Sequence, residues 1–547
     1  MKNLKLFFVV SLIFSTINAY SKELTDYALV NSIIVSQTNL QTIKGWGVTV
    51  NALTNSTAKQ AELIDLGITI ARIYMDHTES NADGTVVTSA MDGICNQIDI
   101  VNRYNLSYIL SSWCPNYSMK DNNVMSGAGK LRTDKEGVFT DYWVNVCAYI
   151  QSKGLPLPTA ISIQNEPTNG TSTYDGMGFQ GQDTYNYTQY YRVIKSLRSK
   201  LDITGYTSVY LLGPEEGSYC TGKTWGNALA FLGGVGFPAF NDATLKNAIW
   251  GCSAHSYNWG GEITDIASWR DGCEKWGKDK WMTEFSDVET VNKSAPTYTF
   301  AIESTRRFCS DMAFVRNNYW LWWSASQGTY PEVLLDGTYY WKLPIYYILQ
   351  KIWKNVPVGS FARKVTSTNS GLVTTDAINM DAVAFVTPEN KTVVVLVNFT
   401  AKSISQSVDG LTGNKADIYQ STSTQNMLLT DSPTISSGVI SSVTLPALSV
   451  TVIVTNNVSE VESIFNKVKN QLSVSVYENE LKIMTGSIAG NVIIYNAKGQ
   501  DIKDLGYLNS NSYTIWDKKN NENNQLPSGI YFFKLKNQSG GCKIFLK

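Results

Sequence analysis

The chain has 547 residues, of which 43% are apolar and 17% charged, the composition of an ordinary folded protein with about two to four domains. The chain has 45 Lys and Arg against 46 Asp and Glu, so it has no excess of positive charge to attract a nucleic acid, and that class of partner is not expected. The 15 Trp and 30 Tyr stand out, because flat aromatic faces suit stacking on sugar rings, although a large core would use them too.

The N-terminal residues have the composition of an export signal. Lys2 and Lys5 precede an apolar run over residues 6–14, and the small residues Ala19 and Ser21 come before a charged pair. An apolar run of this length is too short to cross a bilayer, so residues 1–21 are predicted to be a cleaved signal peptide rather than a membrane anchor. The sequence therefore predicts a secreted or cell-surface protein.

Cysteine and histidine usage indicates no metal site. The eight cysteines all follow the predicted signal and form no Cys-X-X-Cys pair, and the chain has only two histidines. Neither a zinc site nor any other cofactor is therefore expected. Export permits disulfides, but their pairing does not follow from the sequence, and several of the cysteines could be buried thiols.

Residues 45–357 alternate short apolar runs with helical stretches. Strands are predicted at residues 45–50, 69–75, 107–112, 159–164, 208–213, 249–256, 280–284 and 319–324. Helices are predicted at residues 56–66, 91–104, 134–152, 184–200, 265–276, 296–316 and 343–353. This alternation indicates parallel βα units, and eight of them match an α/β fold of the (β/α)8 barrel (TIM barrel) type. The alternative, a doubly wound open sheet, would more usually carry a glycine-rich phosphate turn where this chain has GWGVTV.

After residue 357 the helical pattern ends. Residues 358–455 have the pattern of short strands joined by turns, which predicts an antiparallel β-sandwich beside the barrel. The strand-like residues 30–44, ahead of the barrel, are expected to join that sandwich. A polar linker is predicted at residues 456–471, and a small β domain with hairpin signals at residues 472–547.

The carboxyl ends of the barrel strands are where function is expected. The fourth predicted strand leads to Glu166, and the seventh ends at Glu284. Glycoside hydrolysis needs one protonated and one ionised carboxyl group, and facing strands could hold the two about 5 Å apart, as in a retaining enzyme. We therefore predict Glu166 as the acid/base and Glu284 as the nucleophile, with donors from Arg72 and Tyr257 lowering the pKa of Glu284. Asn165 is placed to bond a sugar 2-hydroxyl.

These strand ends resemble those of glycoside hydrolase family 30, a family of retaining (β/α)8 glycosidases. The resembling stretches are GWGVTVN (45–51), ARIYMD (71–76), SSWCPNYSMKDN (111–122), ISIQNEPTNG (161–170), AHSYN (254–258), WMTEFSD (281–287), YWLWWSA (319–325) and ILQKIWKNVPVGSFARKV (348–365). The resemblance, over about residues 35–455, implies the same two roles for Glu166 and Glu284. It also implies six residues around the sugar at the cleavage point: Asn165, Arg72, Trp113, His255, Tyr257 and Trp323, with Trp322 as the alternative to Trp323.

The resemblance implies a β-linked glycan as substrate. Family members that cut glucuronoxylan use an Arg and a Tyr near the loop after the eighth strand, whereas residues 324–343 contain no Arg. Strict dependence on glucuronoxylan is therefore not expected, because Lys cannot bind a carboxylate through two parallel bonds. A xylan or a β-1,6-linked glucan or galactan is the expected substrate, and a glucosylceramide or a small glycoside cut from its end is the alternative.

The last unit resembles the C-terminal sorting domain of type IX (Por) secretion. VIIYNAKGQDI and LPSGIYFFKL carry the likeness, while the usual opening Pro-Asn-Pro is replaced by VSVYENELKI. The resemblance implies secretion machinery as a partner. The alternative is a small carbohydrate-binding module, for which Trp516 is the one candidate platform.

Two further classes of protein compete with an enzyme. A secreted carbohydrate-binding protein could keep the fold without catalysis, but the presence of both Glu166 and Glu284 argues against it. A cell-surface structural protein would leave the pattern of residues at the strand ends unexplained.

Overall fold

The computed structural model describes residues 32–50, 57–125, 127, 129–168, 176–181, 186–219, 228–232, 242–257, 263–286, 298–325, 342–367, 381–456, 472–476, 481–486, 489–510, 512–536 and 541–546. The predicted signal peptide at residues 1–21 lies outside them. The chain divides into two compact units, Met1–Asn456 and Asn457–Lys547. Among the helices that the structure describes, none has the length and apolarity needed to cross a membrane.

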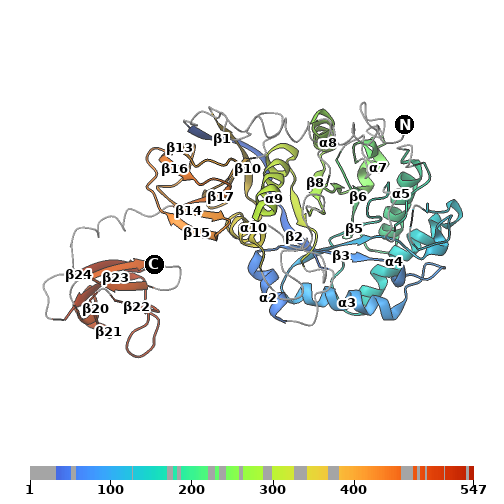
Figure 1. Ribbon diagram of the computed structural model, residues 1–547. Coiled ribbons are helices and arrows are strands. Elements are labelled where there is room, and N and C mark those ends of the chain that lie inside the picture. The colour runs from blue at the N-terminus through green and yellow to red at the C-terminus, as the bar shows by residue number, and fades with distance from the viewer. Residues whose placement is uncertain are drawn as a thin grey trace. The chain divides into compact units, whose positions relative to one another are not determined.

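Eight parallel strands close into a barrel in the first unit, which confirms the predicted (β/α)8 fold (Figure 1). In chain order they are β2 (Gly45–Thr49), β3 (Ile70–Met75), β4 (Ser107–Ser112), β5 (Ala160–Ser162), β6 (Tyr210–Glu216), β7 (Gly251–Ala254), β8 (Asp279–Met282) and β9 (Tyr319–Trp322). Each overlaps one predicted strand. β6 differs most, because it continues through Pro214 to Glu216, three residues beyond the predicted end.

Each strand of the barrel is followed in the chain by one or two α-helices. They are α2 (Thr57–Leu66), α3 (Thr88–Arg103), α4 (Glu136–Ser152), α5 (Thr188–Ile203), α6 (Ala228–Phe231), α7 (Ala243–Ala248), α8 (Ile263–Trp276), α9 (Tyr298–Ser310) and α10 (Pro344–Asn355). The short α6 and α7 were not predicted. The stretch predicted as one helix at 296–316 is α9 followed by a π-helical turn, Asp311–Val315.

Apolar side chains from several strands form one buried layer across the interior of the barrel. Ile70, Ile109, Leu212, Trp281 and Leu321 belong to this layer. A β-carbon at Gly251 would lie 2.5 Å from Nε1 of Trp281, so the indole fits only because that residue has none. Side chains alternate along a strand, so Arg72, two residues after Ile70, also points inward but nearer the carboxyl end. The apolar layer therefore forms the floor under the polar residues of the barrel mouth.

The rest of the first unit is one continuous nine-stranded sheet in the order β15-β14-β17-β12-β11-β10-β1-β13-β16. Its strands are β1 (Ser32–Thr42), β10 (Phe361–Ser367), β11 (Ala382–Val386), β12 (Thr392–Asn398), β13 (Ile404–Asp409), β14 (Lys415–Thr422), β15 (Gln425–Asp431), β16 (Ile440–Leu445) and β17 (Ser449–Asn456). Residues on strands far apart in this order, such as Val443 on β16 and Ile453 on β17, share one core. The sheet therefore folds over on itself as a sandwich, with register irregularities in β1 on either side of Asn39.

A continuous apolar contact joins the barrel to the sandwich. The Trp46 ring on β2 stacks on Trp353 of α10, with centroids 6.0 Å apart, and meets Phe385 of β11 edge-on at 6.1 Å. Nε1 of Trp46 donates to the Val356 carbonyl oxygen at 2.7 Å. Because all of these side chains are buried, barrel and sandwich share one hydrophobic core and form a single rigid support for the site.

The second unit consists of two small antiparallel sheets. One has the order β18 (Leu472–Val476), β19 (Leu481–Thr485), β22 (Tyr513–Trp516), and the other β21 (Asp501–Leu508), β20 (Gly490–Asn496), β23 (Gly529–Leu535), β24 (Gly541–Leu546). Trp516 is 1% exposed in the core of this unit, and its Nε1 donates to the carbonyl oxygen of Lys519. It therefore offers no surface on which a sugar could stack.

Candidate active site

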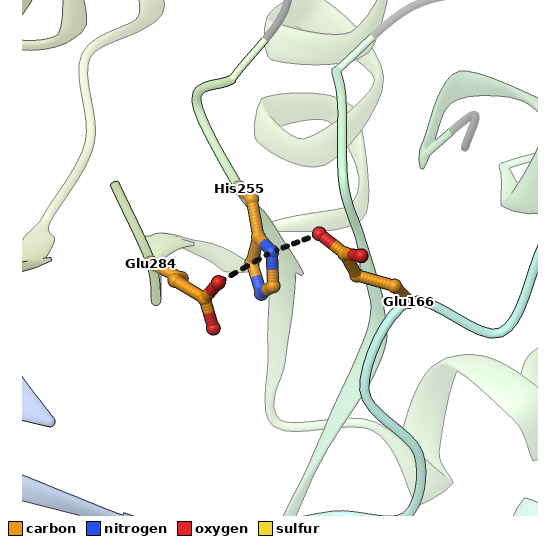
Figure 2. Close-up of side chains that lie close together, drawn as sticks. All are labelled: Glu166, His255 and Glu284. Atoms are coloured by element: carbon orange, nitrogen blue, oxygen red, sulfur yellow. Dashed lines mark hydrogen bonds and ion pairs between the residues drawn. The ribbon is translucent and has the colours of Figure 1, made fainter. Parts of the chain in front are cut away.

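Two glutamates and a histidine meet at the carboxyl ends of the strands. Glu166 follows β5 and Glu284 follows β8, and they are 7% and 6% exposed. Nδ1 of His255 lies 2.8 Å from Oε1 of Glu166 and 3.8 Å from Oε1 of Glu284, so the imidazole stands between the two carboxyl groups (Figure 2). The ligand atoms of all three residues lie within 4.8 Å of one another. The two carboxyl groups are thus close enough to act on opposite sides of one small group.

The backbone at this point is strained. Glu166 has a φ of 43° and Glu215, on β6, a φ of 59°, both in the left-handed region that favours glycine. The amide of Glu166 donates to the carbonyl oxygen of Glu215 at 3.0 Å. Strained residues of this kind persist where the surrounding structure holds them, and they cluster at functional sites.

Arg72 connects the site residues. Nη1 donates to Oε2 of Glu284 at 2.7 Å, Nη2 to Oδ1 of Asn165 at 2.6 Å, and Nε to Oε1 of Glu215 at 3.1 Å. Nη2 also lies 3.1 Å from the hydroxyl of Ser111. The side chain is completely buried, so these acceptors and carboxylate charges together offset the cost of burying the guanidinium.

The contact with Arg72 fixes the orientation of the Asn165 amide. A guanidinium can only donate hydrogen bonds, so the atom of Asn165 at 2.6 Å must be its oxygen. The amide nitrogen then remains as a donor. On the other side of Glu284, the hydroxyl of Tyr257 donates to Oε1 at 2.8 Å, so each oxygen of this carboxylate accepts one hydrogen bond.

The pKa of Glu284 differs in direction from the sequence prediction. Burial raises it above its ordinary value, and the opposing charges of His255 and Arg72 do not overcome that effect. The prediction of a lowered pKa was wrong because it considered the donors and not the burial of the carboxyl group. Burial alone would lower the pKa of His255, but the charge of Glu284 and the hydrogen bond to Glu166 raise it.

Aromatic rings form one wall of the site. Trp113, which follows β4, stacks on Trp323, which follows β9, with centroids 5.3 Å apart, and Tyr74 contacts both rings. Cζ of Arg72 lies 5.7 Å from the centroid of Trp323. Trp322 instead packs edge-on against Phe285, in the hydrophobic core. Of the two registers considered, the structure therefore brings Trp323 to the other site residues.

Glu215 and Glu216 belong to this region and were not predicted. Both are completely buried on β6, and Glu216 accepts hydrogen bonds from Tyr187 and Thr168, each at 2.5 Å. Burial raises the pKa of Glu216 to about 7. The sequence signal was two adjacent acids directly after an apolar run, but Pro214 made the strand appear to end before them.

Glu166, His255 and Glu284 are also the residues here that could in principle ligate a metal ion. Their own hydrogen bonds already engage the facing atoms, and the guanidinium of Arg72 lies against Glu284. A metal ion beside that guanidinium would be repelled by its positive charge.

Six cysteines whose surroundings are described are buried free thiols: Cys95, Cys114, Cys147, Cys252, Cys273 and Cys309.

Comparisons with known proteins relate this architecture to carbohydrate-active enzymes. Residues 362–451 match the model of the glycosyl hydrolase family 30 beta sandwich domain. No curated protein matches the sequence. Among solved structures, the family 30 subfamily 8 xylanase Xyn30A from Clostridium acetobutylicum is 22% identical with a TM-score of 0.61, over 78% of this chain and 99% of that one.

Two other solved structures match a similar share of this chain. A family 30 endoxylanase from Clostridium papyrosolvens C71 is 20% identical with a TM-score of 0.60, over 78% of this chain and all of that one. The endo-β-1,6-glucanase BT3312 is 15% identical with a TM-score of 0.54, over 78% of this chain and 95% of that one. At such identities the likeness establishes a shared fold, a barrel with an attached sandwich. The sandwich itself also matches the family by sequence.

Proposed function

We propose that the protein is a retaining glycoside hydrolase that cleaves a β-linked polysaccharide by double displacement. The observation that carries this proposal is the pair of carboxyl groups of Glu166 and Glu284 at facing strand ends, with oxygens within 4.8 Å. Retaining glycosidases hold their carboxyl groups about 5–5.5 Å apart, whereas inverting ones leave about 6.5–9.5 Å for a water molecule.

In the first step Glu284 attacks the anomeric carbon. A carboxylate oxygen forms the new bond, the bond to the leaving oxygen breaks, and Glu166 gives that oxygen its proton. The hydrogen bonds from Arg72 and Tyr257 orient the attacking carboxylate. His255 can donate to the carboxylate that Glu166 becomes, which stabilises its charge.

In the second step a water molecule attacks the same carbon from the side of the departed group. Glu166 takes a proton from that water, the bond to Glu284 breaks, and the product keeps the configuration of the substrate. Asn165 presents its amide nitrogen to the sugar 2-hydroxyl, because Arg72 already holds its oxygen. Trp113 and Trp323 supply the apolar faces against which the sugar ring packs.

The substrate class follows from what the site offers and from the likeness to xylanases and an endo-β-1,6-glucanase. Lys342, the basic residue nearest the loop after β9, is paired with Glu62 and with Asp65 of α2. A lysine held by two carboxylates is a poor receptor for a uronic acid. We therefore favour a neutral xylan or a β-1,6-linked glucan or galactan, cleaved without a cofactor.

The test is product release from glucuronoxylan, arabinoxylan, β-1,6-glucan, β-1,6-galactan and aryl β-glycosides by the wild type and by the Glu284→Ala and Glu166→Gln variants. Glu389→Gln, in the exposed turn between β11 and β12, is the matched control. Activity on one polymer should vanish in both site variants and persist in the control. An NMR time course that shows inverted product, or turnover that survives in both site variants, would refute the mechanism.

Azide separates the two roles. In Glu284→Ala, azide can occupy the space of the missing carboxylate and should give an α-glycosyl azide from an activated aryl glycoside. In Glu166→Ala the covalent intermediate still forms, so azide should capture it as a β-glycosyl azide. The opposite pairing of products would exchange the two assignments.

We also propose export to the cell surface or medium, supported by the composition of residues 1–21 and by the resemblance of residues 472–547 to a secretion-sorting domain. A carbohydrate-binding role for the last unit loses its candidate platform, because Trp516 is buried. Expression without residues 472–547 should leave the protein inside the cell envelope, while wild type reaches the surface or medium. Equal export of both forms would contradict the proposal.

A further inference from the structure

We propose that Glu215 is a positioning residue that tunes the nucleophile through Arg72, so that its negative charge sets the strength with which Arg72 holds Glu284. This inference rests on the proposed function, because it assumes that Glu284 is the nucleophile. Glu215 is completely buried and its carboxylate accepts hydrogen bonds from Arg72 and Ser111, so its effect on a substrate is indirect.

The hydrogen bonds of Glu215 tie it to other residues of the site. One carboxylate oxygen accepts from Nε of Arg72 at 3.1 Å, and the other accepts from the hydroxyl of Ser111 at 2.5 Å. Its carbonyl oxygen accepts from the amide of Glu166 at 3.0 Å. The main chain of Glu215 therefore contacts the acid/base, Glu166. Its side chain contacts Arg72, which in turn holds the nucleophile, Glu284.

Charge explains what this arrangement does. Arg72 lies between two carboxylates, and the attraction that it gives to Glu284 is shared with Glu215. Glu215 also faces Ser162 of β5, Tyr190 of α5 and His255, which directly follows β7, and of these only the imidazole can carry a charge near neutral pH. Glu215 therefore reduces the net positive charge at Glu284 and keeps that carboxylate a stronger nucleophile than Arg72 alone would leave it.

A purely structural role of Glu215 and a role in tuning Glu284 predict different results. If Glu215 only supports the fold, its loss lowers stability without altering the titration of Glu284. If it tunes the nucleophile, replacing its charge leaves Arg72 bound to Glu284 alone. The ionised form of Glu284 is then stabilised, and the acid limb of the pH profile moves to lower pH while the nucleophile becomes weaker.

The experiment measures pH profiles of kcat and KM for wild type, Glu215→Gln and Glu215→Asp. Glu215→Gln should lower kcat about 10- to 100-fold with little change in KM, and should shift the acid limb to lower pH. Glu215→Asp keeps the charge, so its acid limb should stay near that of the wild type. Asp381→Asn is the matched control, since it removes another buried carboxylate that pairs with an arginine, Arg306, at 2.6 Å.

Two outcomes overturn the inference. One is an acid limb of Glu215→Gln at the wild-type position, as in Asp381→Asn. The other is an acid limb of Glu215→Asp that moves to lower pH as far as that of Glu215→Gln, because the charge of this side chain would then not set the position of the limb. If Glu215→Gln fails to fold, Glu215→Asp is compared with the wild type alone, and a limb moved to lower pH again contradicts the inference. Full activity of Glu284→Ala would instead refute the proposed function.

Discussion

The hydrogen bond from Tyr257 to Glu284 gives the sharpest test of the site, because Tyr257→Phe removes one hydroxyl and keeps the ring. The ring contacts with His255 and Phe285, at centroid distances of 5.8 Å and 6.2 Å, remain possible in the variant. A hydrogen bond to a charged group contributes about 1.5–3 kcal/mol. Its loss should reduce the ionised fraction of Glu284, at pH values where the carboxyl is mostly protonated, by roughly 10- to 150-fold.

The sign of the pH effect follows from the structure. Burial already raises the pKa of Glu284, and the Tyr257 hydroxyl opposes that rise by stabilising the ionised form. Without the hydroxyl the pKa rises further, so the acid limb of kcat/KM should move to higher pH. On the plateau, where Glu284 is ionised in both proteins, kcat/KM of the variant should equal or exceed that of the wild type, because this hydrogen bond weakens as the carboxylate loses its charge in the transition state.

The assay is kcat/KM from about pH 4 to about pH 9 on one substrate for the wild type and Tyr257→Phe. Tyr149→Phe is the matched control, since it removes a tyrosine hydroxyl that donates to a surface carboxylate, Asp92, at 2.8 Å. The control profile should coincide with the wild type. A uniform loss across the whole pH range in Tyr257→Phe, with an unmoved acid limb, would refute the argument.

Three further predictions concern stability, binding and domain organisation. The pKa of Glu216 is raised to about 7 by burial, so its contribution to the free energy of unfolding, about 3 kcal/mol, is present in acid and lost as the pH rises through about 7. Glu216→Gln should therefore narrow the difference in stability between about pH 5 and about pH 8 in urea denaturation, and an unchanged difference would contradict this assignment. Trp323→Ala should lower kcat/KM roughly 10- to 150-fold through loss of about 1.5–3 kcal/mol of apolar contact with the sugar, and a wild-type KM and kcat would remove it from the site. Deletion of residues 457–547 should leave kcat/KM on soluble oligosaccharides unchanged, since each unit has its own core; a tenfold loss would show that the catalytic unit depends on the second one.

Local patterns were enough to predict the barrel. A buried parallel strand is a short apolar run and a covering helix has a three-to-four-residue apolar period, so their alternation is visible without any tertiary contact. The ends of those runs also pointed to Glu166 and Glu284, because every parallel strand of a barrel delivers its carboxyl end to the same face.

The sequence could not give the features that depend on packing between strands. Pro214 made the run before Glu215 appear to end, because proline is rarely tolerated inside a sheet, and only the closed barrel shows that β6 continues through it. The choice between Trp322 and Trp323 required the orientation of β9, since neighbouring residues on a strand face opposite sides.

The direction in which the pKa of Glu284 is shifted also depends partly on sequence and partly on tertiary packing. Its donors, Arg72 and Tyr257, were foreseen from the sequence because both belong to barrel strands or to the residues that directly follow them. The degree of burial was not, because it depends on how all eight strands and their loops close around the carboxyl group. The sequence by itself thus determined which residues reach the mouth of the barrel, and the tertiary structure decided their charge states, since desolvation is a property of the whole surrounding rather than of any one neighbour.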